Sequence, residues 1–146
     1  MNLSEHFTLE EMCRSETGER LGIANKPPAA VIEELKALCA NVLEPLRTGL
    51  GPVVILSGYR SQVLNRAIGS KDTSQHVLGQ AADLYVPGYS HDKVFSWLAA
   101  NTPFDQIIRE FPPNGWVHVS YSVSRQRGNK LLAVRESNRT VYKPYA

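Results

Sequence analysis

Two histidines and one aspartate are the residues of this chain whose types and spacing indicate chemistry. His76 and Asp83 lie in the segment Ser74–Asp83, and His118 lies in the segment Trp116–Ser120. Two imidazole nitrogens and one carboxylate oxygen suit zinc, although other transition metals accept the same donors. Three protein ligands leave one tetrahedral position open for water, whereas structural zinc sites normally have four protein ligands. The residues therefore indicate metal-assisted hydrolysis.

Two strands are expected to bring these residues together. Side chains alternate between the faces of a strand, so Asp83 points to one side of the predicted strand Ala82–Val86. His118 lies on a second predicted strand, Trp116–Tyr121. If the two strands are neighbours, His118 can point toward Asp83, and His76 can fold back over the same face. We interpret the other histidines, His6 and His91, as solvated surface residues, because they lie near predicted helix starts without matching partners.

Helices are predicted mainly in the first half of the chain. A short helix begins at a capping box from Thr8 to Glu11. Three more are predicted from Pro27-Pro28 to near Gly49, from Ser61 to near Gly69, and from Ser90 to near Ala100. Pro45 is expected to kink or shorten the long second helix. Gly18–Asn25 is expected to be a loop.

Strands are predicted mainly in the second half. Besides the two strands above, they cover Val53–Leu56, Gln106–Phe111 and Leu131–Arg135, with a hairpin loop at Pro112–Gly115 and a polar tail from Asn138 to Ala146. The last strand is expected to complete an antiparallel sheet. This order predicts an α+β fold, with helices packed on a mainly antiparallel sheet.

Composition predicts one domain over residues 1–146, since 42% hydrophobic content can form one core. A net charge of +2, from 16 basic and 14 acidic residues that are mostly scattered, argues against nucleic acid as the main partner. No run approaches the roughly 20 apolar residues of a membrane span, and the start has no signal-peptide pattern. Cys13 and Cys39 are expected to be reduced and packed in helical surroundings.

The motifs together resemble a known family of zinc peptidases. They are Ser57-Gly58-Tyr59-Arg60, then Ser74, His76, Gly79, Ala82 and Asp83, and finally Trp116, His118 and Ser120. They resemble the zinc D-alanyl-D-alanine carboxypeptidases, a family that includes phage endolysins and L-Ala-D-Glu endopeptidases. Its fold is similar to the zinc-containing signalling domain of hedgehog proteins. The stretch Asp105–Glu110 resembles a phage-associated branch.

The resemblance implies a function and a set of site residues. His76, Asp83 and His118 would bind Zn²⁺, and Arg60 and Ser74 would lie in the substrate cleft. The expected reaction is hydrolysis of amide bonds in peptidoglycan stem peptides, by a phage-type endolysin or a virion-associated wall hydrolase. A lysin would be held in the host cytoplasm until its release to the cell wall.

The catalytic base is not at its usual place in this sequence. Many members of the family carry an acidic residue shortly before Trp-His, whereas here Trp116 and His118 are separated by Val117. We expect Glu110 to replace it. In a hairpin with Glu110 opposite Trp116, Glu110 shares a face with His118, while a register shifted by one residue would bring Arg109 there instead.

Several alternatives stay open at the level of sequence. Arg60 could stabilise charge on the carbonyl oxygen of the substrate or hold a stem-peptide carboxylate. Ser74 could orient substrate or support the turn that carries His76. The displaced acid leaves room for a catalytically inactive zinc module that binds the wall, and a metal-dependent amidase acting on another small peptide is a weaker possibility. Similarity to the phage members favours endopeptidase over carboxypeptidase activity.

Overall fold

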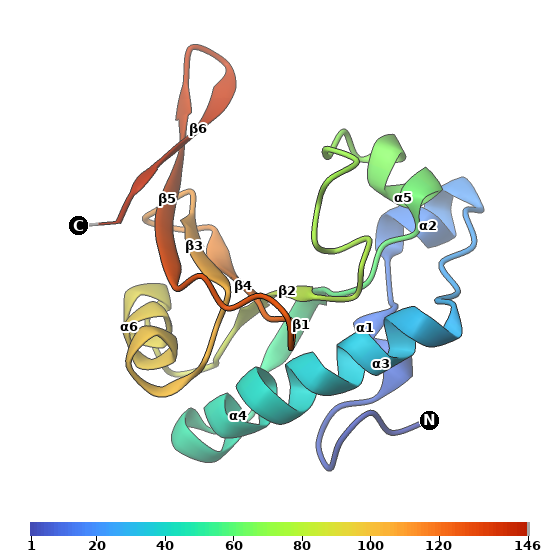
Figure 1. Ribbon diagram of the computed structural model, residues 1–146. Helices are drawn as coiled ribbons and strands as arrows, with labels where there is room; N and C mark the ends of the chain where they lie inside the picture. Colours follow the sequence, from blue (N-terminus) through green and yellow to red (C-terminus); the bar gives the residue numbers. More distant parts are fainter. Residues whose placement is uncertain (146) are drawn as a thin grey trace.

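The computed structural model describes residues 1–145 and combines a six-stranded sheet with helices (Figure 1). The helices are α1 (Leu9–Met12), α2 (Glu16–Leu21), α3 (Ala29–Leu38), a π-helical turn η1 (Cys39–Leu43), α4 (Glu44–Leu50), α5 (Gln62–Ala67) and α6 (His91–Asn101). The strands are β1 (Val54–Ser57), β2 (Ala81–Tyr85), β3 (Gln106–Glu110), β4 (Trp116–Ser120), β5 (Asn129–Glu136) and β6 (Arg139–Pro144). Their order in the sheet is β1-β2-β4-β3-β5-β6. The predicted α+β class is therefore confirmed.

The long helix runs through α3, η1 and α4 in one direction (Figure 1). It continues past Pro45 to Leu50, so Pro45 does not shorten it. Proline has no N–H for the carbonyl four residues earlier, and its ring would clash with that carbonyl. The wider π turn comes directly before Pro45, with the Glu44 N–H bonded to the Cys39 carbonyl. We infer that this turn accommodates the proline without ending the helix.

The strands that carry the chemistry lie at the centre of the sheet. Asp83 on β2 and Ile108 on β3 both pair with His118 on β4, and Glu110 pairs with Trp116. Glu110 and His118 therefore share a face, which is the register expected above. The five-residue connection from Phe111 to Gly115 sets this register, and Gly115 has a positive φ of 67°. A Cβ at Gly115 would collide with the Glu110 carbonyl oxygen, so the turn requires glycine.

Three local expectations are wrong. Part of the expected loop Gly18–Asn25 is helical, because Ser15 caps α2 by accepting from the Gly18 N–H. The expected polar tail instead forms β6, which pairs with β5 through a two-residue turn at Ser137 and Asn138, both with positive φ. β5 is parallel to β3, although all the other strand pairs are antiparallel.

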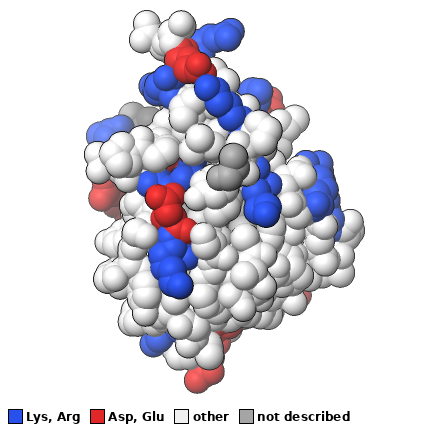
Figure 2. All heavy atoms as spheres, turned by 90° about the vertical axis from the view of Figure 1, so that its left-hand side faces the viewer, with Lys and Arg blue, Asp and Glu red and all other residues white. Residues whose placement is uncertain are grey.

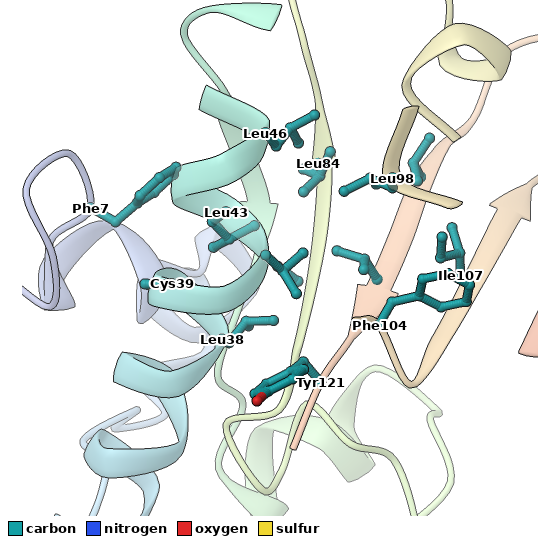
Figure 3. Close-up of a cluster of buried hydrophobic side chains, with 14 of the residues drawn as sticks. Phe7, Leu38, Cys39, Leu43, Leu46, Leu84, Leu98, Phe104, Ile107 and Tyr121 are labelled. Carbon is teal, nitrogen blue, oxygen red and sulfur yellow. The ribbon is translucent and has the colours of Figure 1, made fainter. Parts of the chain in front are cut away.

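The hydrophobic core lies on one face of the sheet, under the long helix and α6 (Figure 3). Leu84 of β2 and Ile107 of β3 point into it from the sheet, and Leu43 and Leu98 close it from the helices. Cys39 is fully buried here, and Cys13 packs at its edge; both are free thiols. Because these side chains occupy one face, Asp83 of β2, Glu110 of β3 and His118 of β4 are directed to the other.

Figure 2 views the α6 side of the molecule, with the β5–β6 hairpin at the top. Basic and acidic side chains alternate over the hairpin, where Lys143 and Glu136 form an ion pair of 3.0 Å. This face therefore has no continuous basic surface of the kind that binds a phosphate backbone. Among the described residues, no helix is both long and apolar enough to cross a membrane.

Candidate metal centre

The three predicted ligands converge on one point at the open face of the sheet. The distance from Asp83 Oδ1 is 3.4 Å to His76 Nε2 and 2.9 Å to His118 Nδ1. One possible ligand atom from each residue lies within 4.8 Å of the other two. Among residues 1–145, this is the one group of His, Cys, Asp and Glu side chains with metal-binding geometry. His6 and His91 lie outside it.

The donor atoms fit a zinc ion. Zinc bonds of about 2.0–2.2 Å at tetrahedral angles place neighbouring ligand atoms about 3.3–3.5 Å apart. The His76–Asp83 distance of 3.4 Å agrees with this value, and the His118–Asp83 distance needs only a small widening. His118 is 9% exposed and His76 3%, so the ligand atoms are largely shielded from solvent.

The orientation of His76 is fixed by its surroundings. Its Nδ1 lies 2.6 Å from the Gly58 carbonyl oxygen, so Nδ1 carries the proton and donates it. The Nε2 lone pair is then free to bind metal, as in most metal sites with histidine ligands. The Ser74 hydroxyl accepts from the His76 N–H at 3.2 Å, and the Arg60 N–H donates to the His76 carbonyl at 3.1 Å. Ser74 thus supports the ligand turn, while its contact with substrate stays a prediction.

The charges at the centre favour metal binding. Burial lowers the pKa of His76, so its imidazole is neutral at physiological pH and available as a ligand. Burial alone would raise the pKa of Asp83, but His76 and His118 beside it more than offset this and hold the pKa well below its usual range. An ionised carboxylate between two imidazoles is the protonation state that zinc requires.

Glu110 lies on the same face of the sheet as the metal ligands. It is two residues beyond Ile108, the β3 residue opposite His118. Burial raises its pKa from 4.5 to about 7, and the charge of Asp83 acts in the same direction. A carboxylate with a pKa near neutrality can both accept and release a proton, as a general base must. Arg109, the alternative residue in the shifted register, points to the opposite face and binds Asp92 at 3.1 Å.

Arg60 faces the same centre from the end of β1. Burial lowers its pKa, while the carboxylates of Asp83 and Glu110 act against that shift. Its buried Nε has no hydrogen-bond partner among the described residues. An unsatisfied buried donor costs free energy, so an acceptor brought within reach of this guanidinium would be bound favourably.

Two aromatic residues extend the row that contains Glu110. Glu110 pairs with Trp116 of β4 on one side and with Ala133 of β5 on the other. Ala133 in turn pairs with Tyr142 of β6. Burial raises the pKa of Tyr142, and the charges of Glu110 and Asp83 add to the rise. The polar composition of residues 138–146 predicts a tail and does not point to Tyr142, although Thr140, Val141 and Tyr142 are all typical of strands.

The comparisons with known proteins give one family match. A protein-family model described as Peptidase M15 matches residues 5–120, which include the three metal-ligand candidates, Arg60 and Glu110. No curated protein matches the sequence. The β5–β6 hairpin, with Tyr142, lies beyond the matched residues.

Proposed function

The chain belongs to the peptidase M15 family, and from this premise we propose that it is a zinc-dependent peptidase that hydrolyses amide bonds in peptidoglycan stem peptides. The observation that carries the proposal is the convergence of His76, Asp83 and His118, with Glu110 on the same face of the sheet. A metal-binding group without an adjacent base would suit a structural site equally well. A carboxylate with a pKa of about 7 beside the group favours catalysis.

The ligand residues would hold one zinc ion and leave part of its coordination open. Bound there, zinc supplies a Lewis acid that acidifies water and polarises an amide carbonyl. The chain's own contribution begins with orientation, because the Gly58 carbonyl fixes the His76 tautomer and the register of β2 and β4 fixes Asp83 against His118.

Glu110 would transfer a proton at the scissile bond, and Arg60 would stabilise negative charge on the substrate. Glu110 would accept a proton from the attacking water on a carboxylate oxygen and deliver it to the leaving nitrogen. The free donor of Arg60 would bind an oxygen of the substrate, either the carbonyl oxygen that gains charge or a nearby carboxylate. Both side chains are partly buried, which strengthens these interactions relative to the same groups in water.

The finer assignment is an endopeptidase of the phage type, either a lysin or a virion-associated wall hydrolase. This assignment is supported by two segments, Asp105–Glu110 and Trp116–Ser120, whose sequences resemble those of the phage-associated branch of the family. A lysin of this kind would be held in the host cytoplasm before it reaches the wall. Mass analysis of released fragments identifies the bond, because a carboxypeptidase releases a terminal alanine and an endopeptidase separates longer stems.

Incubation with purified peptidoglycan tests the enzymatic proposal. We expect new free amines with the zinc-loaded protein, none after chelation, and a loss of about 10²–10⁴-fold in rate for Glu110→Gln with zinc still bound. Glu33→Gln, at a distant exposed position, serves as the matched control. Tight binding to the wall without any cleavage would contradict the proposal and support the inactive zinc module instead.

A further inference from the structure

A cavity of about 460 Å³ lies next to Arg60, between the α1–α2 connection and β1. Arg14 and Arg60 both line it, and Ile55, Leu56 and Ile68 form apolar walls. Its volume lies within the range of small-molecule sites, on the order of 300–1,000 Å³. Figure 1 shows the helices that flank it, α2 and α5, at the same end of the molecule.

Arg60 is the residue that the cavity shares with the surroundings of the metal centre. The same Arg60 side chain lines the cavity and feels the charges of Asp83 and Glu110. A peptide that reaches the metal centre with its scissile bond can therefore extend past Arg60 into the cavity. None of the sequence motifs above pointed to Arg14.

Backbone contacts hold the two arginines in a fixed relation. The Asn25 side-chain amide donates to the carbonyls of Cys13 and Tyr59, each at 2.9 Å, and its oxygen accepts from the Ser61 N–H at 2.7 Å. These contacts join the residue before Arg14 to both neighbours of Arg60. The backbone positions of the two arginines are thus held together by the fold.

The lining indicates the chemistry of the ligand. Arg14 and Arg60 supply two positive charges against the single carboxylate of Glu16. In the described residues neither Arg14 nor Arg60 has an ion pair, so both guanidinium charges are available to an added anion. Leu56 is 49% exposed and Ile68 40%, which leaves apolar surface uncovered beside these charges. A planar guanidinium matches a carboxylate with two parallel hydrogen bonds.

We propose that this cavity is a substrate subsite, in which Arg14 and Arg60 bind a free carboxylate of the stem peptide while the apolar walls contact an adjacent short side chain such as alanine. The inference rests on the proposed function, because it takes the stem peptide as substrate. It adds Arg14 as a specificity residue, selecting peptides whose carboxyl group is free over those in which it is amidated.

A matched pair of peptides tests the subsite by binding. The probes are L-alanyl-γ-D-glutamyl-L-lysine with a free glutamyl α-carboxylate and the same peptide with an α-carboxamide, titrated by calorimetry into zinc-loaded Glu110→Gln protein. We expect the free acid to bind about ten-fold more tightly than the amide. Adding Arg14→Gln should remove this preference, Arg14→Lys should reduce it, and Arg20→Gln, an exposed arginine outside the cavity, should leave it unchanged.

The results separate this subsite from the proposed activity. Cleavage assays on wild-type protein with the same two peptides are expected to show the preference in KM more than in kcat. A preference that depends on Arg14 without any cleavage would support the subsite and contradict the peptidase. Equal binding of the two peptides, no binding of either, or equal effects of Arg14→Gln and Arg20→Gln would overturn the subsite even if wild-type protein cleaves peptidoglycan.

Discussion

Replacing Glu110 by glutamine is expected to stabilise the zinc-free protein at neutral and alkaline pH, although it removes the proposed catalytic base. The pKa of Glu110 is raised from 4.5 to about 7, first by burial and then by the charge of Asp83. The folded protein therefore favours the protonated carboxyl group. Its contribution to stability is full below pH 4.5 and is lost as the pH rises through about 7. Glutamine stays neutral throughout, so it escapes this loss.

The size of the effect follows from the shift. At about 1.4 kcal/mol per pH unit, a rise of the pKa from 4.5 to about 7 corresponds to at most about 3.5 kcal/mol in the free energy of unfolding. Part of the side chain reaches solvent, so the effect should be smaller than this bound. We expect the difference in unfolding free energy between Glu110→Gln and wild type to grow by about 1–2 kcal/mol as the pH rises from 5 to 8. Bound zinc should reduce the gain, because a nearby cation favours the ionised carboxylate.

Urea denaturation in the presence of chelator measures this difference. Unfolding of wild type, Glu110→Gln and Glu33→Gln is followed at fixed ionic strength from pH 5 to pH 8. The Glu33 side chain is 72% exposed, so its variant should follow wild type. If wild type and Glu110→Gln change in parallel over this range, Glu110 is not held in a desolvated position beside Asp83, and its assignment as a base loses its physical support.

Three further substitutions test how the site is held together. Asn25→Ala removes three hydrogen bonds that join the segments beside the metal centre, and should lower the free energy of unfolding by about 2–4 kcal/mol in urea titrations. Gly58→Ala places a Cβ against the Met12 carbonyl and displaces the Gly58 carbonyl from His76, so zinc affinity in a chelator competition should fall about 10–100-fold. Tyr142→Ala should leave zinc content unchanged but lower the acid pKa of the kcat/KM profile, because removing a ring that lies close enough to feel the charge of Glu110 lets water reach that carboxylate. Retention of full wild-type behaviour by any of these variants would contradict the corresponding contact.

The metal centre could be predicted because strand periodicity and pairing are simple rules. Asp83 and His118 share a face once β2 and β4 are neighbours. The register that directs Glu110 to that face is favoured but not fixed, because the predicted loop Pro112–Gly115 is one residue shorter than the connection in the structure. These relations depend on local pattern and on the two-residue repeat of a strand. His76 was identified by its motif, but its orientation depends on the Gly58 carbonyl, which sequence alone does not specify.

The parts that were missed depend on contacts between distant segments. Nothing local indicates that Arg14 lies near Arg60, because Asn25 joins their segments only in the folded chain. The β5–β6 hairpin has a short polar turn at Ser137 and Asn138, and its polar composition concealed a two-stranded extension of the sheet. Asp105 is a similar case, since its buried carboxylate accepts from the Arg127 guanidinium at 2.8 Å, across 22 positions of sequence.

The most direct test of the metal centre is zinc binding in competition with a chromophoric chelator. We expect one zinc ion per wild-type chain, and a loss of at least about 100-fold in affinity when His76, Asp83 or His118 is replaced by alanine. His6→Ala, a histidine outside the group, should bind zinc as wild type does. Wild-type protein that takes up no zinc, or a triad variant that binds it with unchanged affinity, would contradict the assignment of these three side chains to a common ion.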